Sequence, residues 1–184
     1  MSDANELGPL APLAGVWEGD QGTDVAPSEG RGVETNAFRE RMVFDPIGRV
    51  RNHEQSLYGL RYATTAWRLG EADPFHEEVG YWLWDGGAGQ VMRCFIVPRG
   101  VTVLAGGDAA VDARRLVMSA ELGSPVFGIA SNPFLDGHFR TVRYELAVTL
   151  DPDGSLHYEE DTQLQIPDQP EIFHHTDSNT LRKV

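Results

Sequence analysis

The stretch RYELAVTLDPDGSLHYEEDTQLQI, residues 143–166, contains the clearest structural signal in the sequence. In its first half, Tyr144, Leu146 and Val148 alternate with charged or small residues, which is the pattern of a half-buried β-strand. The tetrapeptide DPDG, residues 151–154, then supplies the residue types of a tight turn. Alternation resumes after the turn, so the whole stretch predicts a β-hairpin with one apolar face.

The same alternation recurs along most of the chain, and Gly, Pro, Asp or Asn interrupt it about every ten residues. Helical periodicity is weak, apart from Leu7, Leu10 and Leu13, which predict a short helical turn or 3₁₀ plug near the start. Further strands are predicted at residues 38–44, 56–69, 78–84, 89–97 and 115–122. Consecutive hairpins of this kind fit a closed up-and-down barrel or a two-sheet sandwich, and periodicity does not separate these two all-β folds.

Composition predicts one soluble domain, residues 1–184, with enough apolar residues to bury a core of its own. The formal net charge is -13 and Lys183 is the only lysine, so no basic run offers a surface to nucleic acid or to an anionic membrane. No apolar run reaches the roughly 20 residues of a membrane helix, and the start does not resemble a secretion signal. With Cys94 as the only cysteine, these features predict a cytoplasmic protein.

Motifs that indicate catalysis are scarce. The sequence contains no G-x-S-x-G elbow, phosphate loop, H-E-x-x-H motif or paired-cysteine metal site. In the string FHEEVGY, only His76 and Glu78 share one face of a strand, which favours a hydrogen-bonded strand opening over a metal site. Arg93 lies in an alternating strand, so it either grips a ligand carboxylate inside a cavity or is solvated on the outside.

Two adjacent histidines, His174 and His175, lie in the closing stretch PEIFHHTDSNTLRKV, residues 170–184, where a last β-strand is predicted. Successive side chains of a strand point to opposite faces, so at most one of the two points inward as a metal or haem ligand. The alternative is that both are hydrogen-bonded histidines at the polar edge of that strand.

Two motifs carry a resemblance to a known family: G-x-W-x-G, formed by Gly15, Trp17 and Gly19, and H-x-E-x-G-Y, formed by His76, Glu78, Gly80 and Tyr81. Together with LRYATTAW, GQVMRCFIVPRGV and the closing H…LRKV, in this order, they resemble the nitrobindin family, also called fatty-acid-binding-protein-like β-barrels. The resemblance spans nearly the whole chain.

The resemblance implies a roughly ten-stranded antiparallel up-and-down barrel of the lipocalin type, with an internal cavity and a short N-terminal helical turn. Haem-binding members of the family hold ferric haem through a histidine on the last strand. They are linked to nitric oxide binding and to peroxynitrite isomerisation. The resemblance therefore implies that haem is a candidate cofactor.

This chain departs from the family pattern at two places. The closing motif of the haem-binding members looks like H-L-x-x-x-L, and counting back five residues from Leu181 leads to Thr176. On this count, His174 has the parity of the ligand position and His175 points to the wrong face, unless a bulge restores one of them. The last glycine of the opening motif G-x-W-x-G-x-G is replaced by Gln21. The chain therefore resembles a branch that lacks the haem-ligating histidine.

A ligand pocket is predicted from side chains that share the inner face of their strands. Its members are Tyr62, Thr64, Arg93, Tyr158 and Thr162. A few hydroxyl groups in an otherwise apolar cavity are typical of a site for an amphipathic small molecule. The alternative is that these hydroxyls pair with one another or with buried water.

Three functions follow from these observations. The first is a non-enzymatic protein that encloses a hydrophobic or amphipathic small molecule. The second is a ferric haem protein that binds nitric oxide or isomerises peroxynitrite, with His174 or His175 as the axial ligand. The third is an interaction module that uses the outer surface of the barrel, and a homodimer is compatible with any of the three.

Overall fold

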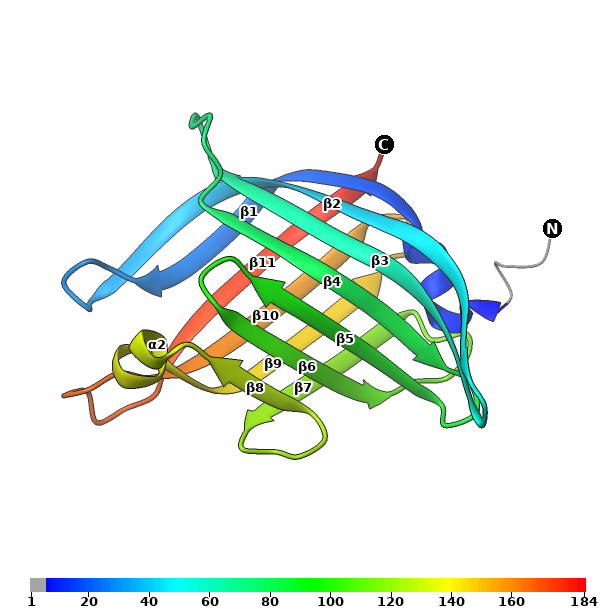
Figure 1. Ribbon diagram of the computed structural model, residues 1–184. Helices are drawn as coiled ribbons and strands as arrows, with labels where there is room; N and C mark the ends of the chain where they lie inside the picture. Colours follow the sequence, from blue (N-terminus) through cyan, green and yellow to red (C-terminus); the bar gives the residue numbers. More distant parts are fainter. Residues whose placement is uncertain (1–5) are drawn as a thin grey trace.

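The computed structural model describes residues 6–184, which form a closed barrel of β-strands (Figure 1). The strands are β1 (Gly15–Pro27), β2 (Val33–Asn52), β3 (Gln55–Arg68), β4 (His76–Asp85), β5 (Gln90–Val97), β6 (Val101–Asp108), β7 (Arg115–Leu122), β8 (Gly128–Ser131), β9 (Arg140–Leu150), β10 (Leu156–Gln165) and β11 (Phe173–Lys183). The barrel closes because β1 pairs with both β2 and β11. Closure confirms the barrel and excludes the sandwich that periodicity left open.

The predicted hairpin at residues 143–166 is the β9–β10 pair. Its register places Val148 opposite Tyr158 and Leu150 opposite Leu156, and all but Leu150 of these side chains are buried. Because side chains alternate along a strand, this register sends one whole set of residues into the barrel. The outer set carries charged residues such as Arg143.

The segment between β7 and β9 contains two elements, although the alternation predicts no strand within residues 123–139. Here β8 runs parallel to β7 and is paired with β6 on its other side. A helix, α2 (Pro133–His138), follows β8 and begins at Asn132, whose side chain accepts a hydrogen bond from the Leu135 amide at 3.0 Å. Elements of four and six residues are too short to show a period. Within residues 6–184, no helix is long and apolar enough to cross a membrane.

The predicted N-terminal plug is the 3₁₀ helix η1 (Gly8–Leu13). Leu10 and Leu13 are buried, and Trp17 Nε1 donates a hydrogen bond to the Leu13 carbonyl oxygen at 2.7 Å. Figure 1 shows this turn at the opposite end of the barrel from α2. The leucine pattern and the tryptophan of the opening motif therefore close one end of the barrel together.

Two motif glycines lie where strands approach closely. A Cβ atom on Gly80 would overlap the backbone carbonyl of Cys94 on β5. The register of β1 shifts between Gly19 and Gly22, and a Cβ on Gly22 would overlap the ring of Phe38. The shift thus brings Gly22 to the crowded inner position, which explains how the chain tolerates Gln21 in place of the last glycine of the motif.

Part of the outer face is apolar. Val79 on β4 lies opposite Ile96 on β5, and Leu104 on β6 lies opposite Cys94. Val79, Ile96 and Leu104 are exposed. This apolar face is compatible with a homodimer, which stays a prediction.

Candidate functional site

The barrel encloses a cavity of about 630 Å³ that extends from Leu13 of η1 to Leu135 of α2. Its apolar floor consists of Leu13, Phe44, Trp82 and Val148, and its apolar rim of Phe75, Leu135 and Phe139. Between floor and rim lies a polar band, which we define as Glu40, Tyr62, Glu78, Arg93, Tyr144, Tyr158 and Glu160. The cavity has the size of a site for a small molecule.

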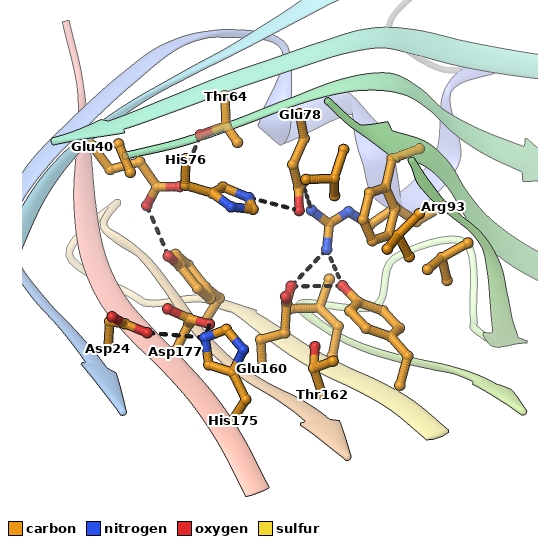
Figure 2. A pocket seen from close by; sticks show the side chains of 18 of the residues that line it. Asp24, Glu40, Thr64, His76, Glu78, Arg93, Glu160, Thr162, His175 and Asp177 are labelled. Atoms are coloured by element: carbon orange, nitrogen blue, oxygen red, sulfur yellow. Dashed lines mark hydrogen bonds and ion pairs between the residues drawn. The ribbon is translucent and has the colours of Figure 1, made fainter. Parts of the chain in front are cut away.

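Arg93 on β5 is the centre of the polar band and is only 3% exposed. Its Nη2 donates to Glu78 and, at 2.9 Å, to the Tyr62 hydroxyl. Its Nη1 donates to Glu160 at 2.8 Å and to the Tyr144 hydroxyl. Figure 2 shows the guanidinium between Glu78 from one wall and Glu160 from the opposite wall. A buried charge is tolerated because two carboxylates neutralise it.

His76 extends this network towards the rim. Its Nε2 lies 3.2 Å from Glu78 Oε1. Burial by itself would lower the pKa of His76, but the hydrogen bond and the charge of Glu78 outweigh it and raise that pKa to about 9. Burial likewise favours protonation of Glu78, yet the charge of Arg93 and the hydrogen bond to His76 hold its pKa below the usual range. At neutral pH this part of the cavity contains an ionised network.

Glu40 on β2 forms a second polar group across the cavity. Its carboxylate accepts hydrogen bonds from the Thr64 hydroxyl and the Tyr158 hydroxyl, both at 2.8 Å, and from Asn179 Nδ2 at 3.3 Å. No cation contacts it among these partners. Burial raises the pKa of Glu40 to about 7, and the charge of Glu78 adds to the rise, although the three hydrogen bonds oppose it. Glu40 therefore gains or loses a proton near neutral pH.

Stability should depend on this proton. The folded-state pKa of about 7 lies above the ordinary value of 4.5, so between these pH values the folded chain holds a proton that the unfolded chain has released. The stabilisation is fully present below pH 4.5 and is lost as the pH rises to about 7. Glu40→Gln should therefore gain about 3 kcal/mol relative to the unsubstituted chain between pH 4.5 and pH 8.

Denaturant unfolding of both proteins at several pH values measures this difference. The exposed Glu159→Gln on the outer face of β10 is the matched control for loss of one carboxyl. A constant difference between Glu40→Gln and the unsubstituted chain across this range would contradict the prediction.

A third group, the β1–β11 cluster, consists of Asp24, His175 and Asp177. His175 Nε2 lies 3.0 Å from Asp24 Oδ1 and 3.5 Å from Asp177 Oδ2. Asn36 Nδ2 donates to the other oxygen of Asp24 at 3.1 Å. Burial raises the pKa of Asp177, and the carboxylates of Glu160 and Asp24 add to the rise against the opposing charge of His175. Figure 2 shows the cluster near the ends of its two strands, facing the cavity.

The predicted pocket residues all line this cavity: Tyr62, Thr64, Arg93, Tyr158 and Thr162. Arg93 faces the cavity and not the solvent. Its terminal nitrogens, however, pair with the protein's own carboxylates, Glu78 and Glu160. The hydroxyls of Tyr62, Thr64 and Tyr158 pair with glutamates rather than with one another.

The pocket predicted from the sequence did not include several polar residues that line the cavity, among them Asp24, Glu40, Tyr144, Glu160 and Asp177. A signal for two of them was present. Glu160 shares the face of Tyr158 and Thr162, and Glu40 lies between Phe38 and Met42 on an apolar face. A charged residue within an apolar alternating set indicates an inward-facing polar group.

The two histidines lie on opposite faces of β11, as expected, but the face inferred by counting was wrong. His175 and Asp177 line the cavity, whereas the His174 imidazole is exposed and pairs with Asp161 at 2.7 Å. The count failed because Leu181 is itself buried inside the barrel, so the position five residues earlier, Thr176, faces outward. Pairing of β11 with β10 is regular, and no bulge alters this parity.

The residues around His175 do not fit a haem iron. The ring nitrogen that points into the cluster is flanked by Asp24 and Asp177. A porphyrin fills the four equatorial positions of its iron, so neither carboxylate could also ligate that iron. Both would be displaced or left unneutralised against the macrocycle, which is costly for the buried carboxylate of Asp24.

Comparisons with known proteins agree with this architecture. A similar solved structure is that of Rv2717c from M. tuberculosis, with 22% sequence identity over 97% of each chain and a TM-score of 0.69. A comparison with curated proteins gives no match. The family model described as "THAP4-like, heme-binding beta-barrel domain" matches residues 6–183. Since this match covers almost the whole chain, the protein belongs to the THAP4-like, heme-binding β-barrel domain family.

Proposed function

We propose that this barrel is a non-enzymatic binding protein for an amphipathic small molecule that carries a cationic or hydrogen-bond-donating group. The observation that supports this most directly is the cavity of about 630 Å³, in which a polar band lies between an apolar floor and an apolar rim. The family membership supports a ligand-binding barrel in general. The polarity of the band supports the chemical class of the ligand.

The charges of the cavity disfavour an anionic head group at the polar band. Five carboxyl groups line the cavity: Asp24, Glu40, Glu78, Glu160 and Asp177. Arg93 is the buried cation among them, and its terminal nitrogens are engaged. A bound ammonium would pair with Glu40, which has no cation partner among residues 6–184 and whose pKa of about 7 allows it to ionise.

Two arginines near the mouth of the cavity would favour an anionic head group instead. Arg68 and Arg99 line the outer part of the cavity, and Arg68 lies over the Phe75 ring at 4.9 Å. A fatty acid would put its carboxylate there and its chain against the polar band, where buried hydrogen-bonding groups make poor partners for methylene groups. We therefore expect an amphipathic amine to bind more tightly than a fatty acid.

A pair of probes with the same chain tests this assignment. Dodecylamine should bind at least about tenfold more tightly than dodecanoate when each displaces a fluorescent amphipath from the barrel. Thr162→Trp, which fills the cavity, should weaken dodecylamine binding by about tenfold or more. Thr102→Trp, on the exposed outer face of β6, is the matched control and should bind as the unsubstituted chain does.

Two results would contradict the proposal. Equal binding by Thr162→Trp and Thr102→Trp would place the probe outside the cavity, and tighter binding of dodecanoate would place the head group at the mouth. Titration of the same samples with hemin tests the alternative function, haem binding, which the family description raises. We expect no Soret band that depends on His175, and such a band, lost in His175→Ala, would favour a haem protein.

A further inference from the structure

We infer that Asp24, His175 and Asp177 form a binding site for a divalent transition-metal ion such as Zn²⁺. The inference goes beyond the proposed amphipathic ligand and does not depend on it. It rests on the positions of the three side chains, on their spacing and on the partner that orients Asp24.

Barrel closure brings the three donors together. Register pairs Asp24 on β1 directly with Asp177 on β11, and His175 lies two residues away on the same inner face. Like charges directly opposite each other on neighbouring strands are destabilising. Asp24 is only 2% exposed, so water screens this repulsion poorly. His175 and the raised pKa of Asp177 relieve part of this repulsion, and a cation held between the carboxylates would remove the rest.

The donor spacing suits a metal ion with short bonds. Ligand atoms about 2.1 Å from a tetrahedral Zn²⁺ lie roughly 3.4 Å apart. His175 Nε2 is 3.0 Å from Asp24 Oδ1 and 3.5 Å from Asp177 Oδ2. All three donor atoms lie within 4.8 Å of one another. A small rotation of one aspartate side chain would therefore complete a three-ligand arrangement.

A second ring of contacts supports the site. Asn36 Nδ2 donates to Asp24 Oδ2 and so orients Oδ1 towards His175. Partners that orient metal ligands in this way commonly raise affinity. Because one imidazole is combined with two carboxylates, the site favours Zn²⁺, Co²⁺ or Mn²⁺ over Ca²⁺, which prefers six or more oxygen ligands.

The fourth position would face the cavity, because all three protein ligands line it. Three protein ligands and an open position are typical of zinc sites that bind an exogenous group. A small ion can be shared by His175 and both carboxylates, whereas an iron in a porphyrin cannot. The metal would replace the proton that His175 shares with Asp24.

Co²⁺ titration of chelator-treated protein, followed by visible absorption, tests the site directly, and Zn²⁺ should then displace the Co²⁺. Absorption should saturate at one ion per chain. His175→Ala and Asp177→Asn should each weaken Co²⁺ binding by about tenfold or more. His174→Ala removes the neighbouring imidazole on the outer face and should leave the affinity unchanged.

Thermal unfolding without metal separates loss of the site from loss of the fold. Asp177→Asn should be at least as stable as the unsubstituted chain, because it removes the repulsion with Asp24. The inference is overturned if no Co²⁺ or Zn²⁺ binds, or if His175→Ala and Asp177→Asn bind Co²⁺ as His174→Ala does. Either result would leave the dodecylamine experiment unaffected.

Discussion

Replacing Arg93 with methionine is expected to lower the free energy of unfolding by about 3–5 kcal/mol. Methionine keeps much of the aliphatic volume but leaves Glu78 and Glu160 without their buried cation. The hydroxyls of Tyr62 and Tyr144 would lose a donor at the same time. Removing one partner of a buried ion pair costs more than the pair contributes, because the remaining charge stays desolvated. Denaturant unfolding at neutral pH measures the loss.

Two variants make the test specific. Arg41→Met removes an arginine that pairs with Glu18 at 3.3 Å on the half-exposed outer face, and it should cost about 1 kcal/mol or less. The double variant Arg93→Met with Glu78→Gln should be more stable than Arg93→Met alone, because it removes one orphaned charge. If Arg93→Met and Arg41→Met lower the free energy of unfolding by similar amounts, the buried network around Arg93 does not stabilise the fold as predicted.

Replacing Trp17 with alanine is expected to cost about 3–5 kcal/mol. Trp17 is 1% exposed, its indole donates to the Leu13 carbonyl oxygen, and the Lys183 ammonium lies 5.0 Å from the ring centroid. Trp17→Ala would leave a cavity beneath η1. It would also lose the hydrogen bond that holds Leu13, the last residue of η1. The plugged end of the barrel should therefore loosen together with the loss of stability.

Thermal unfolding and hydrogen exchange of residues 8–14 measure the two effects. Trp67→Ala is the matched control, because Trp67 packs under Arg39 on the outer face, with the guanidinium 4.2 Å from the ring centroid. This control should cost far less and should leave exchange at residues 8–14 unchanged. A similar cost for both tryptophans would mean that Trp17 contributes no more than a partly exposed ring.

Local patterns predicted the parts of the fold that depend on neighbouring residues. The DPDG turn and the alternation on both sides of it predicted the β9–β10 hairpin, and the spaced leucines predicted η1. The same logic placed Tyr62, Tyr158 and Thr162 on inner faces. Short elements without a period, β8 and α2, were not predicted because four to six residues contain too few repeats.

The sequence by itself determined the all-β class and which residues share a face of each predicted strand, because alternation is a property of the local backbone. Only the tertiary structure decided which face is the inner one along β11. Closure also brought Asp24 beside Asp177, and Arg93 beside Glu160. These partners are distant in the chain and meet only through the pairing of β1 with β11 and across the cavity. No local pattern encodes such distances, so the sequence did not show that His175, rather than His174, faces the cavity.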